Sequence, residues 1–216
     1  MKFPNSFKGV KKIWLAEILM LFAVVLGIIA AVVVALNVTV DGDAVTMSEG
    51  IAATTGIIVL VTALVALIAF ILNLVGLINC RKDDDAFNIA LIVTLVGLAA
   101  SVVSSIWSKN EVLTKWISVV TTLCSLFASY YVLTGIANLS DAYPDAATKA
   151  LCEKSRMWLM WSFCASSVFK FVINIFNLQD GTTIHTIITV VALVLELISY
   201  VLYLRALAKG KDMLAR

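Results

Sequence analysis

Residues 51–79 read IAATTGIIVLVTALVALIAFILNLVGLIN and contain no charged side chain. A helix needs about 20 apolar residues to cross the hydrocarbon core of a bilayer, which is about 30 Å thick. This run exceeds that length. We therefore expect it to form a helix that lies in lipid.

Five further apolar runs accompany this one, and the segments between them are short. They cover residues 13–36, 87–107, 116–139, 157–177 and 182–204. Three charged side chains interrupt them: Glu17, Lys170 and Glu196. With 62% hydrophobic and 14% charged residues and a mean hydropathy of +1.03, the chain has more apolar surface than a soluble core of this size could hide.

These runs predict an all-α membrane protein whose residues 1–216 form a single integral membrane domain. Open sheet edges do not survive in lipid, and a membrane barrel would show alternating strands of about 10 residues. We expect a six-transmembrane-helix bundle built from three helical hairpins.

Basic residues predict the orientation, because positively charged flanks stay on the cytoplasmic side of a membrane. The two ends and alternate loops hold thirteen: Lys2, Lys8, Lys11, Lys12, Arg81, Lys82, Lys149, Lys154, Arg156, Arg205, Lys209, Lys211 and Arg216. The other loops hold two, Lys109 and Lys115. We expect a multi-pass protein with both termini cytoplasmic, in the cytoplasmic membrane if the source is a prokaryote. Topology explains these charges, so nucleic acid is not an expected partner.

The segment Ser140–Arg156 is the longest on the cytoplasmic side. Its second half fits either a short interfacial helix or a solvated linker. The four cysteines form no CxxC pair and, by the predicted topology, none faces outside. Neither a disulfide nor a metal site is indicated, and no cofactor is expected.

Small side chains recur at helical spacing on the first and third runs, and on the fourth at Ser118, Thr122, Ser125 and Ser129. Helices in lipid associate through close packing and interhelical hydrogen bonds, so such stripes predict packing faces. The helix-packing candidates are Ala23, Gly27, Ala31 and Ala35 in the first run and Gly97, Ser101 and Ser105 in the third.

Polar side chains follow one stripe on each of the last two runs. The fifth carries Ser162, Ser166, Lys170, Asn174 and Asn177, and the sixth carries His185, Thr189, Glu196, Ser199 and Tyr203. Because polar groups avoid lipid, both stripes should face the bundle interior, and we expect them to face each other.

Lys170 and Glu196 are the charges within these stripes. Their axial offset is about 10 Å, but side chains lean toward the helix N-terminus and the two helices run in opposite directions, so the groups approach each other. We expect a direct or water-bridged pair. The alternative places Lys170 at the outer interface, with Glu196 protonated or bonded to a serine or tyrosine. A pair could serve either helix packing or a solute site.

Two other titratable residues have simpler interpretations. Glu17 lies a few residues inside the cytoplasmic edge, where anchoring at the interface with Lys11 and Lys12 explains it. His185 lies near the outer end of its run, where solvation competes with a role in a proton relay.

Two functions remain open. An enzyme is not expected, because no nucleophile–base pair, carboxylate pair or zinc motif occurs in the spans. We favour an accessory or scaffold subunit whose small-residue faces dock a membrane partner or a second copy. The alternative is binding or transport of a small solute, anionic or proton-coupled, at an outward-facing site around Lys170, Asn174, His185 and Glu196, with Ser166, Thr189 and Asn177 nearby.

Overall fold

The computed structural model describes residues 2–37, 39–41, 44–46, 48–107, 110–143, 145–175 and 183–216. They form six long helices, α1 (Pro4–Asn37), α2 (Glu49–Cys80), α3 (Asp85–Ile106), α4 (Glu111–Ser140), α5 (Ala146–Ile175) and α6 (Thr183–Leu214). Between α1 and α2, strands β1 (Thr39–Asp41) and β2 (Ala44–Thr46) pair antiparallel, with Thr39 opposite Thr46. The predicted helical bundle is confirmed, and the short strand pair was not expected.

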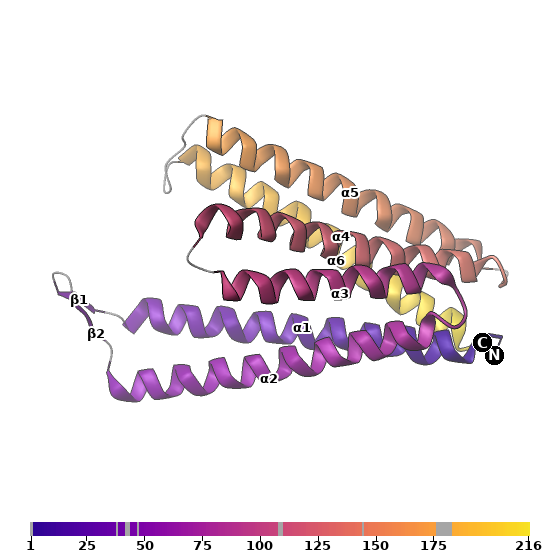
Figure 1. The fold of residues 1–216 in the computed structure, drawn as a ribbon, viewed down its shortest axis with the longest axis horizontal. Coiled ribbons are helices and arrows are strands. Elements are labelled where there is room, and N and C mark those ends of the chain that lie inside the picture. The colour runs from indigo at the N-terminus through magenta and orange to yellow at the C-terminus, as the bar shows by residue number, and fades with distance from the viewer. Residues whose placement is uncertain are drawn as a thin grey trace.

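Successive helices run side by side in opposite directions (Figure 1). The most extensive contacts join α1 to α2, α3 to α4 and α5 to α6, and α6 also contacts α1 and α4. Both chain termini lie at one end of the bundle (Figure 1). We call this the terminal end; it holds the N-terminal turns of α1, α3 and α5 and the C-terminal turns of α2, α4 and α6. The other is the distal end.

Among the described residues, five helices are long enough and apolar enough to cross a membrane: α1, α2, α3, α4 and α6. Large aliphatic side chains cover their outer surfaces; Leu36 is 79% exposed and Leu60 is 61% exposed. Such faces are stable against acyl chains and unfavourable in water. The chain is therefore built as a multi-pass membrane protein whose apolar helices contact the bilayer.

Helix α5 combines a charged beginning with an apolar remainder. Its first turns carry Lys149, Glu153, Lys154 and Arg156, so the apolar part begins only at Met157. The helix nevertheless runs without interruption from Ala146 to Ile175. Asp145 supports its start, since the carboxylate oxygen Oδ1 accepts a hydrogen bond of 3.0 Å from the backbone N–H of Thr148. Residues 146–156 are thus the beginning of α5, and neither a separate interfacial helix nor a linker.

The tightest packing lies at the terminal end. Fully buried side chains there include Ile13, Leu77, Phe87, Leu133, Ile136, Leu207 and Met213. Helices α1 and α2 cross closely at Gly9 and Gly76: a Cβ on Gly76 would lie 2.9 Å from the carbonyl oxygen of Gly9. Glycine at both positions lets the two backbones approach.

Asp83 ties the same end together by hydrogen bonds. One carboxylate oxygen accepts from the backbone N–H of Ser6 at 2.7 Å and from its hydroxyl at 2.8 Å. The other accepts from the amide of Asn5 at 3.2 Å. The turn after α2 is thereby fixed to the first turn of α1, next to the glycine crossing.

Candidate functional site

Several described polar contacts between helices lie on one part of α6. Glu196, Ser199, Tyr200 and Tyr203 follow one another along about 10 Å of that helix. Glu196 and Ser199 bond to α5, whereas the two tyrosines bond to α1. Helix α6 therefore links two neighbours through hydrogen bonds at membrane depth.

Among the described residues, two side-chain hydrogen bonds join α6 to α5. The hydroxyl of Ser166 donates to Glu196 Oε1 at 2.9 Å, and the hydroxyl of Ser199 donates to the backbone carbonyl of Trp158 at 3.0 Å. Ser162, Ser166 and Ser199 are all buried. The polar stripes of the two helices thus meet along this stretch, with a carboxylate and a serine in direct contact.

The distal part of the same stripes is described less completely. Helix α5 includes Lys170 and Asn174, but their side chains lie outside what the structure describes, as does all of Asn177. The predicted pair between Lys170 and Glu196 therefore stays a prediction. Glu196 is exposed at the surface of the bundle.

His185 and Thr189 lie one turn apart near the start of α6. His185 is half-buried, and Thr189 is exposed. The hydroxyl of Thr189 donates to the backbone carbonyl of His185 at 2.9 Å. This local bond satisfies the threonine within its own helix.

Helix α6 contacts α1 through Glu17. The hydroxyl of Tyr200 lies 3.0 Å from the backbone carbonyl of Glu17 and 3.2 Å from its carboxylate oxygen Oε2. The hydroxyl of Tyr203 lies 3.5 Å from Oε1. Glu17 thus joins the first helix to the last. The sequence had suggested only that it anchors the helix at the interface with Lys11 and Lys12.

The sequence held a partial signal for this contact. Glu17 is the one charged residue of the first apolar run, and Tyr203 belongs to the polar stripe of the last. Tyr200 lies beside that stripe, next to Ser199. No local pattern relates residues 183 positions apart, so their pairing emerges only from the packing of α6 on α1.

The helix-packing candidates are distributed over different environments. On α1, Ala23 is buried and Gly27 is half-buried, whereas Ala31 and Ala35 are exposed. The buried glycine and alanines of that helix are Gly9, Ala16, Ala23 and Ala30, at a spacing of seven. Toward the distal end, the buried face of α1 therefore includes Ala30 and leaves out the predicted residues Ala31 and Ala35.

On α3, Gly97 packs against α4. A Cβ at this position would lie 3.0 Å from the Cβ of Cys124. Ser101 and Ser105 are exposed, and their hydroxyls donate to the carbonyls of Gly97 at 3.0 Å and Ser101 at 3.1 Å. The hydroxyls of both serines therefore form their hydrogen bonds within α3 and not with another helix.

Within the described parts of the chain, no group of three or more His, Cys, Asp or Glu side chains is arranged to hold a metal ion. No protein-family model, curated protein or solved structure matches the chain.

Proposed function

We propose that the chain is a non-enzymatic accessory or scaffold subunit of a membrane complex, which binds another membrane helix along the distal halves of α1 and α2. The proposal includes the finer topology, with all six helices crossing the bilayer as three hairpins and both termini in the cytoplasm. Two features support this topology. Helix α5 lies along α6 (Figure 1), and both termini lie at the end of the bundle that carries most of the basic residues.

The observation that carries the proposal is the contrast between glycines at the two ends of the bundle. At the terminal end each helical glycine meets a neighbour: a Cβ on Gly135 would lie 2.5 Å from the Phe87 ring, and one on Gly210 would lie 2.7 Å from Ile136. A Cβ on Gly27 or Gly56 would have no atom of another helix within 4 Å.

A glycine inside a helix costs about 1 kcal/mol relative to alanine. Close helix packing offsets that cost in a membrane protein. Gly27 on α1 and Gly56 on α2 receive no such packing from the described chain. A further helix that packs against them would supply it.

The two glycines lie at the same level of the antiparallel pair. Gly27 is about 27 Å along α1 from Gly9, and Gly56 is about 30 Å along α2 from Gly76, which crosses Gly9. Ala31 and Ala35 extend the stripe of Gly27 and are exposed. Together they give α1 a small-residue face that the rest of the chain leaves open.

The test is purification of the tagged protein from its native membranes in a mild detergent, with the mass of the complex as the readout. We expect the wild type to retain a second polypeptide, and Gly27→Leu to lose it without a change in thermal stability. Ala99→Leu, at an exposed position of α3, is the matched control and should retain the polypeptide. A wild type that purifies as a single 23.3 kDa chain would contradict the proposal.

A second function, binding of a small anionic or proton-coupled solute, is favoured by one contact. Ser166 holds the Glu196 carboxylate at membrane depth, on the stripe that also carries Lys170, Asn174 and His185. Proteoliposomes containing wild type or Glu196→Gln test it by uptake of anions with a pH-sensitive dye inside. Uptake that Glu196→Gln abolishes would favour this function over the scaffold.

A further inference from the structure

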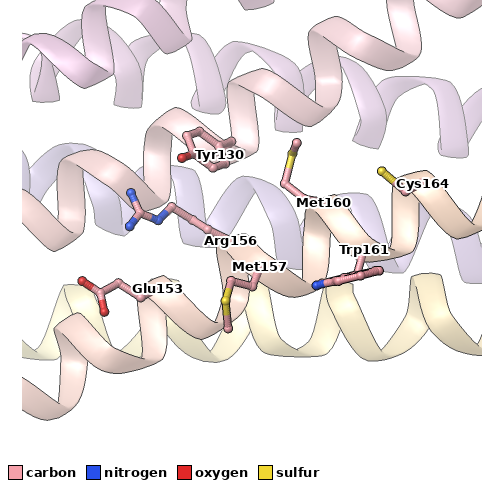
Figure 2. Close-up of a pocket in the computed structure, with 7 residues that line it drawn as sticks. All are labelled: Tyr130, Glu153, Arg156, Met157, Met160, Trp161 and Cys164. Atoms are coloured by element: carbon pink, nitrogen blue, oxygen red, sulfur yellow. The ribbon is translucent and has the colours of Figure 1, made fainter.

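A pocket of about 480 Å³ lies between α4 and α5, on the terminal half of the bundle. One lining residue, Tyr130, comes from α4, and the others come from successive turns of α5: Glu153, Arg156, Met157, Met160, Trp161 and Cys164. Figure 2 shows these side chains along the two helices, with Arg156 pointing toward Tyr130. Nothing in the two proposed functions uses this pocket.

The lining changes in character along α5. Glu153 and Arg156 occupy one end, and Met157, Met160 and Trp161 continue from them (Figure 2). Arg156 is the last charge before the apolar part of α5 begins. The charged end therefore lies at the depth of lipid headgroups and the apolar end at the depth of acyl chains. Trp161 is 73% exposed, so the pocket opens sideways toward the bilayer.

Two contacts from α4 hold the Arg156 guanidinium in place. It lies 5.3 Å from the centroid of the Tyr130 ring, and one of its nitrogens donates to the Thr134 hydroxyl at 3.1 Å. A guanidinium has five N–H donors, and Thr134 takes one. Donors remain for a phosphate group, which arginine binds in a bidentate manner.

Glu153 supplies the opposite charge at the same end. It is exposed, one turn before Arg156. In the part of the chain that the structure describes, no hydrogen bond or ion pair engages its carboxylate. A bare phosphate would be repelled by this carboxylate, whereas a headgroup that also carries an ammonium would be attracted.

We infer that the pocket binds one phospholipid whose headgroup carries both a phosphate and a primary ammonium. The phosphate lies on Arg156, the ammonium lies near Glu153, and an acyl chain runs along Met157, Met160 and Trp161. Such a lipid covers exposed apolar surface of α5, including Met157 and Trp161. It also matches both charges at the mouth, which a purely anionic lipid does not, and its ammonium can donate N–H hydrogen bonds to the Glu153 carboxylate, which a quaternary ammonium cannot.

The experiment uses the full chain, purified in detergent, stripped of lipid and titrated with phosphatidylethanolamine, phosphatidylglycerol or phosphatidylcholine. Native mass spectrometry counts the bound lipids, and thermal unfolding reports the stabilisation. We expect one phosphatidylethanolamine to bind at least tenfold more tightly than the other two. Arg156→Gln should weaken it by about tenfold or more, because charge-assisted hydrogen bonds are lost.

Three further variants sharpen the test. Glu153→Gln should remove the preference over phosphatidylglycerol, and Met160→Trp should block binding by filling the apolar part. Lys154→Gln, an exposed neighbour that does not line the pocket, should bind as the wild type does. If Arg156→Gln fails to fold, Arg156→Lys replaces it, keeping the charge but losing bidentate contact. Equal binding of all three lipids, tighter binding of phosphatidylglycerol, or unchanged binding by Met160→Trp would overturn the inference.

Discussion

The hydroxyl of Tyr200 on α6 lies within hydrogen-bond distance of both the backbone carbonyl and the carboxylate of Glu17 on α1. This contact joins the first and last helices of the chain. It lies next to the Ser199 bond that joins α6 to α5. Helices α1 and α5 are therefore both hydrogen-bonded to α6 through groups within about one turn of that helix.

Tyr200→Phe removes the hydroxyl and leaves the Glu17 carboxylate with fewer donors. Interhelical hydrogen bonds in membranes contribute about 0.6 to 2 kcal/mol, so we expect the free energy of unfolding to fall by about 1 kcal/mol. Titration with denaturing detergent in mixed micelles measures it. Tyr131→Phe is the control, because the described chain gives the Tyr131 hydroxyl no hydrogen bond. Equal losses for the two variants would show that the Glu17 contact contributes nothing.

The pairing of Lys170 with Glu196 can be tested by single and double replacements. Lys170→Met should destabilise the bundle more than Lys170→Met combined with Glu196→Gln, because the single change leaves one charge without its partner. The same unfolding titration compares the free energies. Additive losses would indicate that Glu196 depends on Ser166 and not on Lys170.

The orientation of the chain can be read from single-cysteine variants in a background that lacks the four native cysteines. Probes that replace Arg81 and Lys154 should react only with a cytoplasmic reagent, and probes at Ser48 and Asn110 only with an external one. All four positions are exposed, so access depends on the side of the membrane. Reaction of Lys154→Cys from outside would place the start of α5 on the wrong side and refute the three-hairpin topology.

The native thiol of Cys152 should react very slowly with alkylating reagents while the protein is folded. It precedes the apolar part of α5, and burial raises the pKa of this thiol to about 12. The reactive species is the thiolate, so alkylation in the folded protein should stay slow well above pH 9, the ordinary range of a free thiol. Unfolding in detergent should make it react at once. Fast alkylation of folded protein near pH 9, followed by mass spectrometry of the modified peptide, would contradict this packing.

Much of the fold could be predicted because lipid imposes a strong pattern on sequence. The uncharged run at residues 51–79 lies within α2, and residues 87–107 coincide with α3 to within two residues at each end. The outer ends of the first and last helices were harder to predict, because α1 begins at Pro4 and α6 continues to Leu214, well beyond their apolar runs. Their charged turns remain helical since they pack at the terminal end, where Val10 and Leu214 are fully buried.

The sequence predicted the part of the candidate site where polar side chains recur at helical spacing. It could not predict contacts between residues that are far apart in the chain. The stripes on α5 and α6 placed Ser166 and Glu196 toward each other, as their hydrogen bond shows. The contact of Glu17 with Tyr200, and that of Asp83 with Ser6, depend on how separate hairpins pack. Neither produces a local spacing, so the sequence marked Glu17 as a charge within an apolar run but could not indicate either pairing.

Site-specific photo-crosslinking in native membranes tests most directly whether a partner lies at the open face of α1. A benzophenone side chain at the exposed position Ala31 should form a product with a second polypeptide. The same probe at Ala16, which is 2% exposed, should give only products within the chain. Crosslinks from Ala31 to lipid alone would contradict the proposed docking face.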